Sequence, residues 1–221
     1  MRFWSIRPGT FGPVHTVVMA TMWIAACTAC LLSLALLALP IVASNAAPPH
    51  DLRPVKSRFT ILDLTRCDLT HSHPDGNAWR CEGIKGFPVH IAEGDARFFL
   101  SFGDEAETRR AATQTLAPFN TVFPDGKSRL TIEWRYRRRD GPDRPYAVIV
   151  RYFTADGEGR KGEVLVVTRL TAKEACHLAY VDALSNAEPV ALARSAADEL
   201  AADFDCSGEP RVVGVRGKSP M

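Results

Sequence analysis

Residues 146–170 read YAVIVRYFTADGEGRKGEVLVVTRL, two runs of Val, Ile, Leu and aromatic residues joined by a glycine-rich turn. Such residues favour strands, and the turn between them predicts a hairpin. In both runs apolar side chains occupy consecutive positions, at Val148–Val150 and at Val164–Val167. Because successive strand residues point to opposite faces, we expect this sheet to be covered on both sides.

One of the two covers is visible further along the chain. Pro189 suits the first turn of a helix, and apolar residues recur after it with helical spacing. The face that they form consists of Leu192, Ala193, Ala196, Ala197, Leu200 and Phe204. Small alanine side chains let a helix lie close to a sheet, so we predict a C-terminal α-helix packed on one face.

Further strands are predicted on both sides of the hairpin. Apolar side chains occupy every second position in residues 87–91, 98–102 and 130–136. Residues 176–181 add a last strand before the helix. The predicted fold class is therefore α+β, an antiparallel sheet of about six to seven strands with the C-terminal helix on one face.

Three segments have a less regular pattern. Residues 58–64 suit a strand or a short helix, with Phe59 and Ile61 on one face. Residues 65–77 are rich in turn formers and predict a polar loop. Residues 104–116 suit either a short helix or a long surface loop.

The N-terminus carries an export signal. An uncharged, mostly apolar run over residues 17–43 follows a segment that bears Arg2 and Arg7 but no acid. The basic end stays inside, so the chain beyond the run is exported. Small residues up to Ala46 are typical of a cleavage site, which predicts that residues 1–46 are a signal peptide. The run is also long enough to remain as a hydrophobic membrane helix. The rest is then periplasmic or secreted, or anchored to the inner membrane by this run.

The exported part divides into a linker, one domain and a tail. Residues 47–57 are proline-rich and polar, residues 58–206 suffice for a single α+β domain, and the glycine-rich segment 207–221 is expected to be a flexible tail. The chain has 27 basic and 25 acidic side chains, and removal of Arg2 and Arg7 balances them. This balance argues against a nucleic-acid partner, and leaves only the N-terminal segment for membrane contact.

Four cysteines follow the apolar run: Cys67, Cys81, Cys176 and Cys206. An even number in an exported chain favours disulfides, and three pairings are possible. Their clustering along the chain favours Cys67 with Cys81 and Cys176 with Cys206.

The sequence contains few signs of catalysis or metal binding. His71, His73 and Asp75 are the most ligand-like group, but the nearby cysteines are explained by a disulfide, which leaves too few ligands for a closed metal site. The exported part has no nucleophile elbow, Cys-x-x-Cys pair or phosphate-binding glycine loop. We therefore predict no metal site and no cofactor.

Several short motifs are distinctive as a set. They are Trp79–Gly83, Glu93–Asp95, Ala112–Leu116, Glu133–Arg135 and the segment 196–206. Over about residues 58–206 the chain resembles a group of uncharacterised exported proteins of α-proteobacteria. The resemblance implies a Gram-negative periplasm and brings no catalytic residues with it.

Four residues are candidates for binding. Arg135 begins an arginine run and Arg151 lies nearby, and guanidinium groups can hold phosphate or carboxylate. Strand alternation sends the aromatic neighbours of Arg135 to the opposite face, which favours a solvated hairpin tip over a ligand site. Gln114 and Asn120 lie in the segment 104–121, which we expect to be an exposed loop.

The favoured hypothesis is a non-enzymatic periplasmic module that binds or inhibits a protein or another envelope component. The rival is a small hydrolase or ligand-binding enzyme with a site built from dispersed residues, namely Asp95, Glu133, Arg135 and Arg151. A deep pocket lined by several of these residues favours the enzyme, and an exposed protein-binding surface favours the module.

Overall fold

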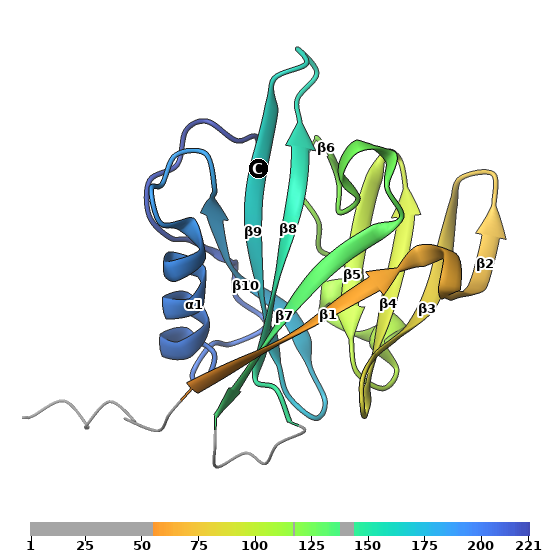
Figure 1. Ribbon diagram of the computed structural model, residues 1–221, viewed down its shortest axis with the longest axis horizontal. Helices are drawn as coiled ribbons and strands as arrows, with labels where there is room; N and C mark the ends of the chain where they lie inside the picture. Colours follow the sequence, from red (N-terminus) through yellow and green to blue (C-terminus); the bar gives the residue numbers. More distant parts are fainter. Residues whose placement is uncertain (1–54, 117, 138–143) are drawn as a thin grey trace, which may run out of the picture. The chain divides into compact units, whose positions relative to one another are not determined.

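The computed structural model, drawn in Figure 1, describes residues 55–116, 118–137 and 144–221. The apolar run 17–43 and the cleavage site lie outside the described residues. Within the described part of the chain, no helix is long and apolar enough to cross a membrane. The first strand begins at Val55, inside the predicted linker.

The larger of two sheets has seven strands in the order β1-β7-β8-β9-β10-β11, with β6 paired to β8 beyond the part that pairs with β7. Neighbours are antiparallel, except that β10 and β11 are parallel. The strands are β1 (Val55–Asp63), β6 (Phe119–Thr121), β7 (Arg129–Arg137), β8 (Ala147–Ala155), β9 (Lys161–Leu170), β10 (Ala175–Asp182) and β11 (Arg211–Val212).

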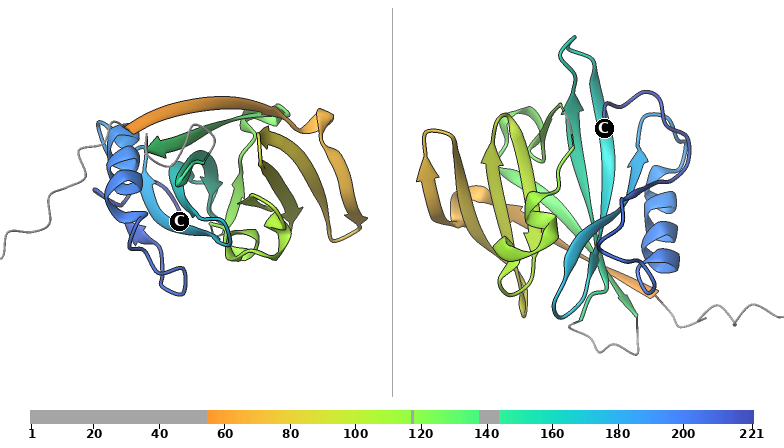
Figure 2. Two further views of the ribbon diagram at one scale, coloured as in Figure 1. Left: turned by 90° about the horizontal axis from the view of Figure 1, so that it is seen from below. Right: turned by 180° about the vertical axis from the view of Figure 1, so that it is seen from behind.

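The smaller sheet is an antiparallel meander of four strands. Its strands are β2 (Asp68–His73), β3 (Gly76–Ile84), β4 (Phe87–Gly94) and β5 (Arg97–Phe102). The meander covers one side of the large sheet, and helix α1 (Pro189–Leu200) covers part of the other side, as Figure 2 shows.

Two apolar cores result from this arrangement. The core between the sheets contains Val148 and Val150 of β8 together with Trp134 of β7, all of them buried. The core under α1 contains Ile149 of β8 and Ala193 of the helix. The consecutive apolar residues of β8 therefore serve two cores, and the predicted cover on both faces and the C-terminal helix are confirmed.

The single sheet predicted from the sequence is in fact two sheets. The segment 68–73, predicted as part of a polar loop, is strand β2, and every one of its residues is exposed. β2 pairs with β3 through backbone hydrogen bonds. Because no face of β2 is buried, its sequence shows no alternation of apolar and polar residues.

The segment 104–116 forms two short 3-10 turns, η2 (Ala106–Thr108) and η3 (Arg110–Thr113), in place of a helix. Arg109 between them has extended backbone, with φ −83° and ψ 155°. Ala106 and Ala111 of these turns are buried, so the segment packs against the domain. It contacts both β5 and β10.

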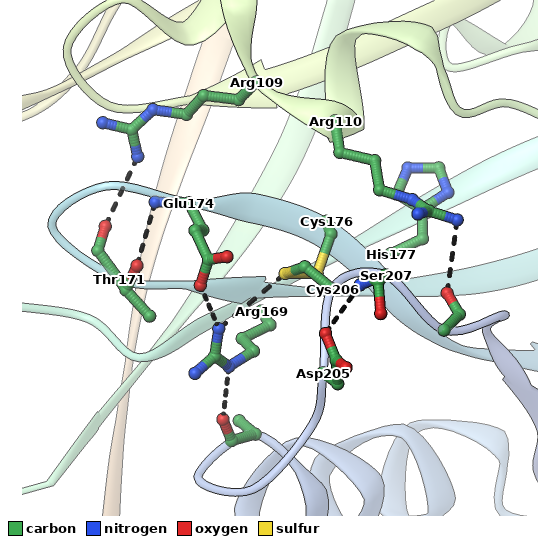
Figure 3. Close-up of a disulfide and its surroundings, with 12 residues drawn as sticks. Arg109, Arg110, Arg169, Thr171, Glu174, Cys176, His177, Asp205, Cys206 and Ser207 are labelled. Atoms are coloured by element: carbon green, nitrogen blue, oxygen red, sulfur yellow. Dashed lines mark hydrogen bonds and ion pairs between the residues drawn. A yellow bond between two sulfur atoms is a disulfide. The ribbon is translucent and has the colours of Figure 1, made fainter.

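The structure contains two disulfides, Cys67–Cys81 and Cys176–Cys206. This is the pairing favoured by the spacing of the cysteines. The second joins β10 to the turn that follows α1 (Figure 3). Disulfides persist in oxidising compartments, which indicates a location outside the cytoplasm.

The C-terminal segment is held in place and does not form the flexible tail predicted for residues 207–221. Asp182 at the end of β10 is 0% exposed and accepts hydrogen bonds from the backbone nitrogens of Gly217, Lys218 and Ser219 at 3.0, 2.8 and 3.0 Å. Burial alone would raise the pKa of the Asp182 carboxyl, but hydrogen bonds from Ser185, Ser219 and the tail lower it well below its ordinary value.

Candidate functional site

A cluster of buried charges lies between the large sheet and α1. β7 directs Glu133 and Arg135 toward the helix, and each side chain is 8% exposed. Arg135 donates to both carboxylate oxygens of Asp198 at 3.1 and 2.5 Å and to Ser57 Oγ at 2.6 Å. Arg194 donates to the two oxygens of Glu133 at 2.7 and 3.2 Å. These alternating charges hold the helix on the sheet.

The sheet also supplies the cations at the end of α1. The last turn of the helix has no basic residue of its own. Arg137 donates to the carbonyl of Asp198, and Arg169 donates to the carbonyl of Ala201 at 2.8 Å. Cations at the C-terminal end of a helix stabilise it through their interaction with the helix dipole. Burial alone would lower the pKa of Arg135, while the hydrogen bond and charge of Asp198 raise it.

Asn120 and Gln114 hold their loop in place. Asn120 is 6% exposed; its Oδ1 accepts from the Phe98 nitrogen at 3.0 Å and its Nδ2 donates to the Leu116 carbonyl at 2.6 Å. Gln114 Oε1 accepts from the backbone nitrogen of His177 at 2.8 Å. The loop is therefore attached to β5 and β10, and it is not the freely exposed loop that the sequence predicts.

The four residues of the enzyme hypothesis do not form one site, because Glu133 and Arg135 lie 3.6 Å apart beneath α1 while Asp95 and Arg151 are paired elsewhere. Arg151 is half-buried and pairs with Glu163 across β8 and β9, whereas Asp95 pairs with Arg97 at the turn between β4 and β5. Glu133 and Arg135 are occupied beneath α1. None of the four lines either of the two cavities of about 630 and 650 Å³ that the described residues form.

Two histidines occupy strands. His177 is 1% exposed, its Nδ1 lies 2.9 Å from Tyr180 Oη, and burial lowers its pKa to about 3. His90 lies opposite Ser101 in the register of β4 and β5. The Ser101 hydroxyl is buried and has no hydrogen-bond partner among the described residues. Neither histidine therefore activates a nucleophile in the way that covalent catalysis requires.

The possible metal ligands on β2 and the turn after it are His71, His73 and Asp75. The rings of His71 and His73 stack at 6.3 Å between centroids, and His73 Nδ1 lies 3.2 Å from Asp75 Oδ2. The residues that the structure describes contain no group of three or more His, Cys, Asp or Glu side chains that could hold a metal ion.

The free edge of β1 is the candidate functional site. β1 is the terminal strand of the large sheet, and its nine residues pair with β7 without a register shift. No described segment pairs with its other edge. A long, regular edge strand without proline is a template on which another strand can form.

Two large apolar side chains on β1 are open to solvent. Phe59 is 57% exposed and Ile61 is 74% exposed, whereas Leu62 on the opposite face is 4% exposed. In the register of the sheet Phe59 lies beside Glu133 and Ile61 beside Thr131. Both therefore lie on the face that carries α1, in the part that the helix leaves uncovered.

The other edges of the two sheets are protected. β2 has a register shift between Leu69 and His71, and β11 is only two residues long. The edge of β5 is occupied because Thr115 donates to the Phe98 carbonyl at 2.6 Å and Asn120 accepts from the Phe98 nitrogen. Natural sheets use such devices to prevent unwanted pairing. β1 has no register shift, is nine residues long and has no described segment along its free edge, and its charged side chains are Lys56, Arg58 and Asp63.

The sequence contains a weak signal for this site. The alternation in residues 58–64 separates Phe59 and Ile61 from Leu62. Which of two apolar faces is buried depends on the position of α1 and of the second sheet. The periodicity of the strand does not contain that information.

Comparison of the chain with protein-family models, with curated proteins and with solved structures finds no match to any of them.

Proposed function

We propose that this protein is a non-enzymatic binding module of the Gram-negative periplasm, and that an extended segment of another envelope protein adds to the free edge of β1. The observation that carries the proposal is the combination of an unprotected nine-residue edge with Phe59 and Ile61 exposed beside it. In β-strand addition, main-chain hydrogen bonds supply affinity and alternate side chains supply specificity.

The side chains of β1 define the chemistry of the partner. Phe59 and Ile61 favour apolar side chains at every second position of the added strand. On the opposite face Lys56 is exposed. The proposed partner segment therefore carries apolar side chains at alternate positions and an acidic side chain beside Lys56.

The dispersal of the charged candidates also supports a module over an enzyme. Arg135 and Glu133 stabilise the position of α1, and Asn120 fixes a loop, so these three side chains have structural partners. Asp95 is paired with Arg97 and Arg151 with Glu163, so neither completes an acid–base set with Glu133.

Affinity capture with matched variants tests the proposal. The oxidised protein is immobilised as wild type, as Phe59→Lys/Ile61→Lys and as Val215→Lys, then exposed to solubilised envelope. Val215 is 62% exposed, so its substitution controls for loss of an apolar surface side chain elsewhere. We expect one saturable partner whose affinity falls by more than about tenfold in the β1 variant and stays unchanged in the control.

Hydrogen exchange then locates the contact. Addition of the captured partner is expected to slow exchange of β1 backbone amides, because strand addition protects them. A partner retained equally by all three proteins, or protection only outside β1, would contradict the proposal. Association of the protein only with a second copy of itself, seen as a doubled mass by light scattering, would contradict it as well.

A further inference from the structure

A second candidate site lies away from β1. Four connections surround a cavity of about 630 Å³: the β3–β4 turn, the segment after β5, the approach to β8 and the β9–β10 hairpin. In Figure 1 these connections lie at the lower end of the sheets. The volume is in the range of small-molecule pockets, which is about 300–1,000 Å³.

Arg109 is the fixed cation of this cavity. Its guanidinium donates to the carbonyls of Asp104, Thr171 and Ala172 at 3.0, 3.3 and 3.2 Å, so it joins the segment after β5 to the β9–β10 hairpin (Figure 3). All three acceptors are neutral. Arg109 forms no ion pair among the described residues, so its positive charge is held in place without a counter-charge.

Gly103 makes room for this guanidinium. Its φ is +97°, and a Cβ at this position would lie 3.0–3.2 Å from the guanidinium atoms of Arg109. That separation is closer than ordinary packing permits. The glycine therefore leaves space for the guanidinium, and two of its five N–H groups donate to no described residue in the hydrogen bonds given above.

Two further cations border the cavity from other connections. Lys85 of the β3–β4 turn and Arg144 before β8 are exposed, and neither forms an ion pair with any described residue. Among the described residues that line the cavity, Asp104 is the one acid. Phe87 and Leu170 add apolar surface to the lining. The cavity thus combines excess positive charge with an apolar wall.

We propose that this cavity binds an organic oxyanion, a carboxylate or phosphate group attached to an apolar moiety. Guanidinium and ammonium groups recognise such oxyanions through charge-assisted hydrogen bonds. Phe87 and Leu170 favour an apolar attachment over a free inorganic ion. The site shares no residue with β1, so it stands independently of the proposed strand addition.

An NMR titration of the oxidised protein tests the site. Benzoate and phenyl phosphate carry an oxyanion on a ring, and benzyl alcohol carries the ring alone. We expect both anions to shift the Nη–H resonances of Arg109 and the amides of Gly86 and Gly103, and the alcohol to shift none of them. The tighter of the two anions identifies carboxylate or phosphate as the preferred group.

Charge-neutral variants provide the decisive control. Lys85→Gln/Arg144→Gln removes two exposed cations and is expected to weaken anion binding by about tenfold or more. Arg66→Gln removes an exposed cation that does not line the cavity, and binding should not change. An equal loss in both variants would reduce the effect to non-specific charge attraction. Absence of the Arg109 shift with either anion would also overturn the proposal.

Discussion

The part of the large sheet beneath α1 buries charged side chains, whereas the edge strand β1 exposes apolar ones. Beneath the helix, Glu133 and Arg135 are buried and paired with partners on α1. On β1, Phe59 and Ile61 are exposed. In this protein a charged residue is therefore not necessarily on the surface, and an apolar residue is not necessarily in the core. What each residue does depends on whether another element covers it.

The difference also separates structural residues from the candidate binding residues. A buried charge whose partner is lost is costly, whereas an exposed apolar side chain is replaced at little cost to folding. Stability and binding should therefore respond to different substitutions, and the following predictions test this separation.

The largest effect is expected when the buried charge network is broken. Arg135→Met leaves Asp198 and Glu133 without their shared cation, and should lower the free energy of unfolding by about 3–5 kcal/mol. Chemical denaturation measures this change. Arg151→Met is the matched control, because Arg151 is 35% exposed and its pair with Glu163 should contribute no more than about 1 kcal/mol. Equal effects of the two substitutions would remove the distinction between buried and exposed charge.

The next effect concerns the disulfide beside the helix. Cys176 and Cys206 are 30 positions apart in sequence. In the chain-entropy model, replacing both with serine should cost about 3–4 kcal/mol. Thermal unfolding of the double variant at neutral pH measures the loss. Partner binding at β1, tested below the unfolding transition, should be retained. Loss of binding by a fully folded variant would show that the two regions are coupled.

Several features of the fold could be predicted because local patterns determine them. The two apolar faces of β8, the alanine-lined helix and the cysteine pairing all follow from spacing along the chain. Two strands of the second sheet, β4 and β5, were predicted, but their separation from the large sheet was not, because β2 has one apolar residue, Leu69, and its pairing depends on backbone hydrogen bonds. The C-terminal segment is held by Asp182, whose partners in that segment lie more than thirty positions away, and also by contacts with Asn186 and Glu163.

Acidic pH should lower the free energy of unfolding because one histidine is buried in the native state. Because burial lowers the pKa of His177 from its ordinary value near 6.5 to about 3, the native state resists the proton that the unfolded chain accepts. Stability should therefore fall as pH drops from about 6.5, by up to about 1.4 kcal/mol per pH unit, until about pH 3. Denaturation at pH 7, 6, 5 and 4 measures the slope.

His177→Gln provides the comparison for this slope. The variant lacks the titrating ring, so its stability should change less between pH 6 and pH 4 than that of the wild type, whatever its stability at pH 7. Parallel curves for the two proteins would contradict the assignment to His177.

The smallest effect on stability is expected at the candidate site itself. Phe59→Lys/Ile61→Lys replaces two exposed side chains and should change the free energy of unfolding by no more than about 0.5 kcal/mol for each substitution. Chemical denaturation beside the wild type checks this. A loss comparable to that of Arg135→Met would mean that these side chains belong to the core, and would remove the main reason for assigning them to binding.

The candidate sites were harder to predict than the fold for a physical reason. Arg135, Asn120 and Gln114 are residue types that often bind ligands, but here buried partners occupy them. Phe59 and Ile61 look like core residues until the position of α1 shows that nothing described covers them. The cationic cavity joins Lys85, Arg109 and Arg144 from separate connections, and no local spacing brings these three together.

Site-specific photo-crosslinking in the intact envelope tests the central claim most directly. A photoreactive residue is placed at position 59 or 61, with position 215 as the exposed control. Strand addition at β1 predicts a crosslinked product with one other envelope protein from positions 59 and 61 and none from position 215. Products from position 215 alone, or only a product of twice the chain mass, would contradict strand addition by a partner at β1.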